Sequence, residues 1–151
     1  MTYKLLTKPE LTDRYIRHVN LMRIVDGDTY EVYIKQGFKQ GFEDKIRLNR
    51  LNTPEAVGPE SPAGKYVVKQ IEGWLGTENQ LILHSVDWNI DRYGRVLGDL
   101  YKYDGENLNQ WLLISGYAWP TDSNGSMTVD RDIRRLNLPK GIIDQVLINQ
   151  R

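Results

Sequence analysis

Alternating apolar and polar side chains in the first third of the chain predict β-strands. Residues 18–34, HVNLMRIVDGDTYEVYI, hold two β-rich segments joined at Asp26-Gly27, a dipeptide typical of tight hairpin turns. The polar segment 35–44, KQGFKQGFED, has the composition of a loop, and a third strand is predicted around residues 45–51. Three successive strands with hairpin-length connections predict an antiparallel meander.

The spacing of apolar residues then changes from two to about four, which predicts an α-helix. Ser61 is a good N-cap, Pro62 suits the first helical position, and Gly76 is a natural stop. The apolar stripe that would face the core is formed by Ala63, Val67, Ile71 and Leu75.

Two further strands are predicted at residues 80–86 and 95–103, on either side of the polar turn DWNIDRYG. Asn107 can cap a short helix that ends before Gly116. Beyond that helix, TDSNGSMT has the composition of a loop, whereas the apolar spacing in GIIDQVLI (141–148) is helical.

This order of elements predicts an α+β fold that is mainly β. Five short strands with a helix after the third fit a small closed Greek-key barrel of the OB type. A second helix would follow the fifth strand, and the C-terminal tail would be irregular or helical. We divide the chain into an N-terminal extension (1–12), a barrel domain (13–120) and a tail (121–151) that we expect to pack on the same domain.

Composition narrows the classes of function. A chain of 151 residues can bury one proper core, and the absence of cysteine excludes disulfides, thiolate metal sites and cysteine nucleophiles. The 20 basic and 20 acidic side chains cancel. Proteins that bind long nucleic acids through many phosphates are usually basic. The zero net charge therefore argues against binding to a long stretch of nucleic acid. It still permits a local pocket for one or two phosphates.

Two further features concern location. No apolar run approaches the roughly 20 residues that span a bilayer. The first fifteen residues, MTYKLLTKPELTDRY, lack the apolar core and cleavage site of a secretion signal. We therefore expect no membrane association, and a cytoplasmic protein unless the sequence is a processed mature form. We also expect a monomer.

Three short segments carry charged residues that strands and turns alone do not need. The first is VDGDT, around Gly27. Taken alone, this segment is a hairpin turn. In the functional alternative, Asp28 is a hard oxygen ligand for a divalent cation such as calcium.

The second segment is KIRLNRLNTPEA (45–56). Its Arg47 should lie on the strand face opposite to the apolar side chains, where a guanidinium can donate two hydrogen bonds to a phosphate. The alternative is a surface arginine paired with an acidic neighbour. Pro54 stiffens the corner that presents the Thr53 carbonyl and the Glu55 side chain, although Thr-Pro-Glu also opens ordinary turns.

The third segment is DRYGR (91–95). Gly94 allows a tight or left-handed turn, and Arg92 and Arg95 offer two more phosphate-binding groups. Taken alone, the segment is an ordinary charged hairpin connection.

The order of the three segments is far more specific than any one of them. Asp-Gly-Asp-Thr, then Arg with Thr-Pro-Glu, then Asp-Arg-Tyr-Gly-Arg closely resembles the staphylococcal nuclease (thermonuclease) family, from about Arg23 to Gly116. The resemblance implies an OB-fold barrel and a calcium-dependent phosphodiesterase that acts on DNA and RNA. Members of this family cut between phosphorus and the 5′ oxygen and leave 3′-phosphates.

The resemblance also implies a role for each matched residue. Asp28 would bind calcium through its carboxylate, and Thr53 through its backbone carbonyl. Glu55 would activate or orient the attacking water. Arg47 and Arg95 would clamp the phosphate and stabilise the charge that develops on it.

The sequence departs from the family pattern at several points. Asn52 stands where the motif usually has a second aspartate ligand, and because an amide oxygen carries no charge we predict weakened calcium affinity. The loop after Pro54 is shorter, and the tyrosine pair that packs on the substrate nucleotide has no aligned counterpart. We expect Arg92 and Tyr93 to contact substrate. Trp119 is a candidate for stacking on a base, the alternative being an exposed or core tryptophan.

The leading interpretation is an active, metal-dependent endonuclease that acts on DNA or RNA. The main alternative is a catalytically impaired nuclease-like module that binds single-stranded nucleic acid or a protein partner. Retention of Arg47, Glu55 and Arg95 favours the enzyme, whereas Asn52 favours the module. A purely structural role for the barrel would not explain why these charged residues are clustered.

Overall fold

The computed structural model describes residues 15–90 and 93–151, with the side chains of 87–90 left out; the proposed N-terminal extension and Arg92 lie outside the described residues. Five strands form a closed barrel in the order β1-β2-β3-β6-β5, which confirms the predicted mainly β, OB-type α+β fold. All neighbouring strands are antiparallel except the parallel pair β3–β6. The barrel strands are β1 (Ile16–Asp26), β2 (Thr29–Gly37), β3 (Gln40–Leu48), β5 (Gln80–Ile90) and β6 (Val96–Tyr101).

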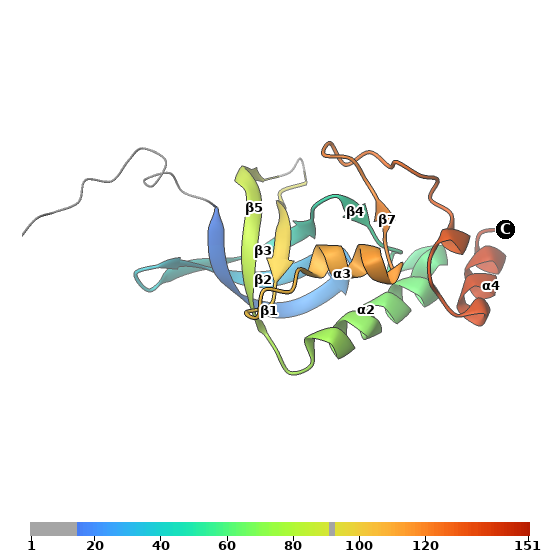
Figure 1. The fold of residues 1–151 in the computed structure, drawn as a ribbon, viewed down its shortest axis with the longest axis horizontal. Coiled ribbons are helices and arrows are strands. Elements are labelled where there is room, and N and C mark those ends of the chain that lie inside the picture. The colour runs from blue at the N-terminus through green and yellow to red at the C-terminus, as the bar shows by residue number, and fades with distance from the viewer. Residues whose placement is uncertain (1–14, 91–92) are drawn as a thin grey trace, which may run out of the picture.

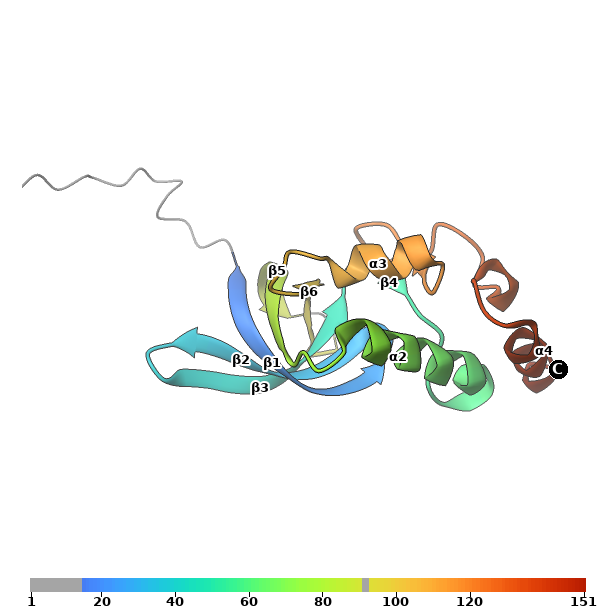
Figure 2. The same cartoon turned by 60° about the horizontal axis from the view of Figure 1, so that its bottom comes forward.

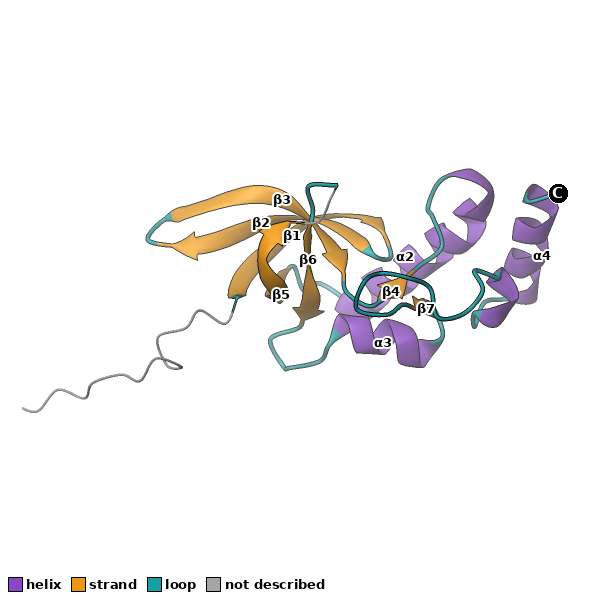
Figure 3. Cartoon of the chain, turned by 90° about the horizontal axis from the view of Figure 1, so that it is seen from above, coloured by secondary structure: helices purple, strands orange, loops and turns teal. Residues whose placement is uncertain are grey.

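The helices gather at one end of the barrel, and the β2–β3 hairpin projects from the other end (Figures 1 and 2). Figure 3 shows a small two-stranded sheet, β4–β7, at the helical end of the molecule. No helix in the described part of the chain is both long and apolar enough to cross a membrane. The remaining elements are β4 (Leu51–Asn52), η1 (Gly58–Glu60), α2 (Ser61–Leu75), α3 (Leu108–Ser115), β7 (Trp119–Pro120), η2 (Ile133–Arg135) and α4 (Lys140–Asn149).

Apolar side chains form two adjoining clusters. The larger one fills the barrel and includes Val67, Ile71 and Leu75 of the predicted α2 stripe. The smaller one lies at the start of α2, where Ala63 and Trp119 pack with tail side chains such as Val146 of α4. The tail after β7 therefore covers the end of α2 that lies nearest to the β4 corner.

The prediction of a polar loop at 35–44 was wrong. β2 and β3 continue through this segment and are joined by a two-residue turn, Phe38-Lys39, in which both residues have positive φ (53° and 64°). Position 41 of β3 requires glycine, because a Cβ there would lie 2.5 Å from the Ile34 carbonyl oxygen and 2.6 Å from the Tyr33 side chain. The polar composition reflects a hairpin that projects into solvent on both faces.

Two boundaries also differ from the predictions. Ser61 is the first helical residue and not the N-cap, because the turn η1 runs directly into α2 and leaves Glu60 at the cap position. β5 extends to Ile90 and so includes half of the predicted polar turn. The cap of α3 is as predicted, since the Asn107 side chain accepts a hydrogen bond from the backbone of Gln110 at 2.9 Å.

Asn109 of α3 ties the barrel to the turn that precedes β4. Its side chain is 5 % exposed; Oδ1 accepts from the backbone N–H of Leu100 at 3.2 Å. Its Nδ2 donates to the carbonyl of Asn49 at 3.0 Å and to that of Gly98 at 3.3 Å. The buried amide of Asn109 thus fixes the position of the Asn49 turn relative to β6. That turn leads directly into β4.

We expect Asn109→Leu to lower the free energy of unfolding by about 3 kcal/mol, because it leaves buried backbone groups without partners. A loss of this size should lower the melting temperature by about 10 °C in a domain of this length. Chemical denaturation followed by circular dichroism measures the effect, and Gln110→Ala, at the exposed next position, is the matched control. Equal stability of the two variants would contradict the assigned role.

Candidate active site

The β1–β2 turn packs directly against the corner that follows β4. A Cβ on Gly27 would lie 2.8 Å from the Thr53 hydroxyl oxygen, so only glycine fits there. Asp28 Oδ2 accepts the backbone N–H of Thr53 at 2.9 Å, and Asp26 Oδ1 accepts that of Ala56 at 2.7 Å. The Asp-Gly-Asp segment is therefore both the predicted hairpin turn and the support of the Thr53 corner.

Asp28 and Arg47 meet across the β2–β3 pair. The Asp28 carboxylate accepts from the Thr29 hydroxyl at 3.1 Å, and its Oδ2 lies 3.4 Å from Arg47 Nη2. Arg47 Nη1 donates to the carbonyls of Leu48 and Leu51, each at 2.9 Å. Both charged side chains are largely buried, and these bonds fix the guanidinium beside β4 in the orientation that the strand pattern predicts.

Asn52 contacts the same Arg47 nitrogen, Nη2, that lies near Asp28. Arg47 Nη2 donates to Asn52 Oδ1, while Asn52 Nδ2 lies 3.0 Å from the sulfur of Met127. Because a guanidinium only donates, the amide must turn its oxygen toward Arg47. The Asn52 oxygen and the Asp28 carboxylate consequently face the same group.

An open pocket of about 610 Å³ adjoins this cluster. Its wall includes Arg47, Arg95, Tyr93 and the loop 123–126. The parallel pairing of β3 with β6 brings Arg47 close to Arg95, which immediately precedes β6. The Tyr93 side chain is 66 % exposed, and the Arg95 guanidinium carbon lies 5.0 Å from its ring centroid. The pocket thus offers three arginines, since Arg50 also lines it, and an exposed aromatic ring to an anionic ligand.

Glu55 follows the Thr53 corner, and its side chain is 57 % exposed. Its backbone N–H donates to Glu60 Oε1 at 3.0 Å. Partial burial raises the pKa of the Glu55 carboxyl, and the negative charges of Asp26 and Asp28 raise it further, against the opposing effect of Arg131. Glu55 is not among the described residues that line the pocket. It stands at the edge of the site, where water has access.

Arg131 is a member of the site that sequence analysis missed. Its Nη2 donates to the Thr53 carbonyl at 3.1 Å and to Glu60 Oε1 at 2.8 Å, and its guanidinium stacks 4.6 Å from the Trp119 ring centroid. Burial lowers the pKa of Arg131, but the hydrogen bond and charge of Glu60 outweigh this effect and raise it. No local motif marks Arg131, because it lies beyond the end of the resemblance at Gly116.

The assignment of Trp119 to base stacking is corrected by its position. Its side chain is 1 % exposed, and Nε1 donates to the carbonyl of Asp132 at 3.0 Å. The indole forms part of the smaller apolar cluster, so the alternative of a core tryptophan is right.

The oxygen atoms of the corner fit a hard divalent cation. The Asp28 carboxylate, the Asn52 amide and the Thr53 carbonyl offer only oxygen, which calcium prefers. The Thr53 hydroxyl oxygen is buried without a hydrogen-bond partner among the described residues. No group of three or more acidic, histidine or cysteine side chains in the described part of the chain forms a ready metal site. These ligands are therefore of the type that calcium binds, but only the Asp28 carboxylate among them carries a negative charge.

Comparison with known proteins agrees with this geometry. Residues 45–137 match the family described as staphylococcal nuclease homologues. An uncharacterized endonuclease of Escherichia coli is 29 % identical over 102 residues, and the match covers 68 % of this chain and 60 % of that protein. A protein of Escherichia coli O157:H7 with the same description matches to the same extent.

A third relative is the succinoglycan biosynthesis protein ExoI of Rhizobium meliloti, 26 % identical over 108 residues, which cover 67 % of this chain and 51 % of that protein. The chain thus spans between about half and 60 % of the length of these curated relatives. The family match covers more than half of the chain and includes Arg47, Glu55 and Arg95. The chain belongs to the family of staphylococcal nuclease homologues.

Proposed function

We propose that this protein is a calcium-dependent nuclease that hydrolyses phosphodiester bonds of DNA or RNA. The observation that carries the proposal is the convergence of Arg47, Arg95 and Asn52 on one pocket, with Asp28 3.4 Å from Arg47. A phosphate in that pocket would meet the guanidinium group of Arg47 from β3 and that of Arg95, the residue before β6. The endonuclease names of the Escherichia coli relatives support the same chemistry.

In the proposed mechanism, Arg47 and Arg95 orient the phosphodiester and stabilise the negative charge that grows on its oxygens during in-line attack. Asp28, Asn52 and the Thr53 carbonyl would hold the cation, which would add positive charge at the phosphate. Glu55 orients the attacking water and accepts its proton. Because the pKa of Glu55 is raised, its carboxylate is a better base than an ordinary glutamate.

The bond that breaks in this proposal joins phosphorus to the 5′ oxygen, which leaves a 3′-phosphate and a 5′-hydroxyl, as the family resemblance implies. Tyr93 is proposed to contact the substrate, because its exposed ring lies at the pocket wall beside Arg95. Single strands are the favoured substrate, since unpaired bases can reach a flat aromatic ring. The protein is proposed to act as a monomer.

The proposal is tested by cleavage of fluorescently labelled single-stranded DNA during a calcium titration, with a chelator control. We expect Asn52→Asp to lower the half-saturating calcium concentration about tenfold, because it adds a charged oxygen ligand. Asn124→Asp places a charge in the exposed loop of the same pocket and is the matched control. Tight calcium use by the natural chain, unchanged by Asn52→Asp, would contradict the assigned role of Asn52.

The second candidate function is a binding module, because guanidinium groups donate hydrogen bonds to two of the oxygen atoms that the cation would use. Arg47 donates to the Asn52 amide, and Arg131 donates to the Thr53 carbonyl. Such a module would bind single-stranded nucleic acid in the pocket without cutting it. Binding without cleavage at any calcium concentration, by a folded protein, distinguishes it from the nuclease.

A further inference from the structure

Arg131 brings a positive charge from the C-terminal segment to the Thr53 corner. Its Nη2 lies 3.1 Å from the Thr53 carbonyl oxygen and 3.9 Å from Glu55 Oε1. It reaches this corner from a segment 78 residues further along the chain. The residue therefore couples the tail to the two positions that the proposed mechanism uses as metal ligand and base.

The Arg131 guanidinium is held in place by two further contacts. Glu60, which is 9 % exposed, accepts from Arg131 Nη2 at 2.8 Å and from Nε at 3.1 Å, a paired arrangement of charge-assisted bonds. On its flat side the guanidinium lies 4.6 Å from the centroid of the buried Trp119 ring. These contacts fix the guanidinium beside the Thr53 carbonyl.

A bound cation and this guanidinium would repel each other strongly. Calcium binds carbonyl oxygens at about 2.3–2.6 Å. Since Arg131 Nη2 is already 3.1 Å from the same Thr53 oxygen, the two charges would lie within about 6 Å of each other. At this distance, near a partly buried surface, like charges interact with an energy that changes binding by tenfold or more.

We propose that Arg131 is a positioning residue that competes with the divalent cation for the Thr53 carbonyl oxygen. This inference rests on the proposed function, because it assumes that the Thr53 oxygen is a cation ligand. In the cation-free protein, Arg131 neutralises the acidic corner and holds the carbonyl in place. A bound cation would take the place of Arg131 Nη2 at the Thr53 oxygen, while the bonds from Arg131 to Glu60 could remain.

The competition acts in the same direction as the asparagine at position 52. Asn52 removes one negative charge from the expected ligand set, and Arg131 adds one positive charge beside it. Both features lower cation affinity, so the site should fill only at high calcium concentrations. Removing Arg131 should therefore tighten binding although no ligand is added.

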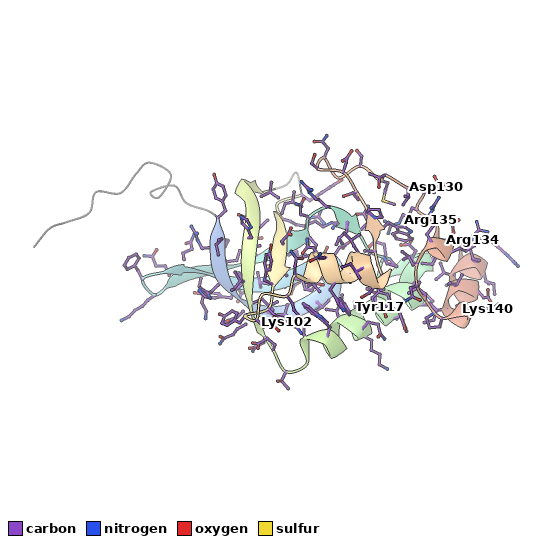
Figure 4. All side chains as sticks on the ribbon, in the orientation of Figure 1. Lys102, Tyr117, Asp130, Arg134, Arg135 and Lys140 are labelled. Atoms are coloured by element: carbon purple, nitrogen blue, oxygen red, sulfur yellow. The ribbon has the colours of Figure 1, made fainter. Side chains whose placement is uncertain are left out.

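The experiment is isothermal titration calorimetry of the full chain with calcium chloride, without nucleic acid, so that the readout is independent of activity. We expect Arg131→Gln to lower the calcium Kd at least about tenfold, as expected for removal of one nearby like charge. Arg134→Gln is the matched control. It removes the same charge three residues away, where the guanidinium is 68 % exposed and pairs with Asp132 at the end of the molecule formed by η2 and α4 (Figure 4).

A second variant guards against a loss of folding, because Arg131 also packs on Trp119. Arg131→Lys keeps the positive charge, but its single nitrogen cannot form the paired bonds to both Glu60 oxygens while it donates to Thr53, so we expect a smaller tightening, about threefold. Thermal unfolding checks each variant before titration.

Equal calcium affinity of the natural chain, Arg131→Gln and Arg134→Gln would overturn the competition while leaving the calcium site intact. Absence of calcium binding by every variant would overturn both the competition and the proposed calcium dependence.

Discussion

Replacement of Arg47 by alanine is expected to reduce the cleavage rate about 10³-fold or more, the range found for arginines that stabilise a phosphoryl transition state. Arg47 lies between the Asp28 carboxylate and the Asn52 amide, and it also lines the pocket. Its removal deletes both the proposed contact to the phosphate and the group that bonds to the Asn52 oxygen and pairs with Asp28. The measurement is kcat on labelled single-stranded DNA at saturating calcium.

Arg134→Ala is the control for this variant, because it removes an arginine that bonds to Asp132 outside the pocket. Lysine at position 47 tests geometry separately from charge. Lys keeps the charge but cannot form the fork of bonds to Asn52 and to the backbone carbonyls, so Arg47→Lys should recover little activity. Full activity in Arg47→Ala, with normal folding, would remove Arg47 from the catalytic site.

Glu55→Gln is expected to lower kcat about 10³-fold, within the range found for loss of a general base. Glutamine keeps the shape of the side chain but cannot accept the proton of the attacking water. The matched control is Glu72→Gln on the exposed face of α2. Activity equal to that of the control would show that Glu55 is not the base.

Glu55→Gln, which should lower kcat, should raise the stability of the folded protein. The pKa of Glu55 is raised from its ordinary value of 4.5, first by burial and then by Asp26 and Asp28, so the folded state disfavours the charged form. A raised pKa in the folded state means that stability is complete below pH 4.5 and falls as pH rises through the folded value. In chelator, Glu55→Gln should therefore raise the melting temperature at about pH 7 and leave it unchanged at about pH 3.5.

Much of the fold could be predicted because local rules and tertiary packing agree along most of the chain. The apolar stripe from Val67 to Leu75 and the Asn107 cap place α2 and α3 correctly. The Asp26-Gly27 turn is also correct, and the glycine is needed for a second reason, its close approach to Thr53. That second reason is tertiary, and no pattern of neighbouring residues reveals it.

The errors arose where composition depends on tertiary context. Segment 35–44 is polar because its hairpin extends beyond the barrel, so polarity was mistaken for a loop. Trp119 was assigned to the substrate because a lone tryptophan carries no sign of burial. Arg131 carries no motif at all, and it joins the site only because the tail folds back over the start of α2 onto Glu60.

Charged side chains from two parts of the chain surround the Thr53 corner of the proposed site. Asp26 and Asp28 hold the corner from the barrel side, and Arg131 with Glu60 hold it from the tail side. These hydrogen bonds fix the position of the corner. A site of this kind should respond to calcium with a small structural change and low affinity.

The most direct test of the central claim is mass spectrometry of the products formed from one defined single-stranded oligonucleotide in calcium and in chelator. The proposed function predicts fragments with 3′-phosphate and 5′-hydroxyl ends in calcium, and intact oligonucleotide in chelator. Fragments with 5′-phosphate ends would contradict the proposed bond cleavage, and an intact oligonucleotide in both conditions, with folded protein, would contradict the nuclease itself.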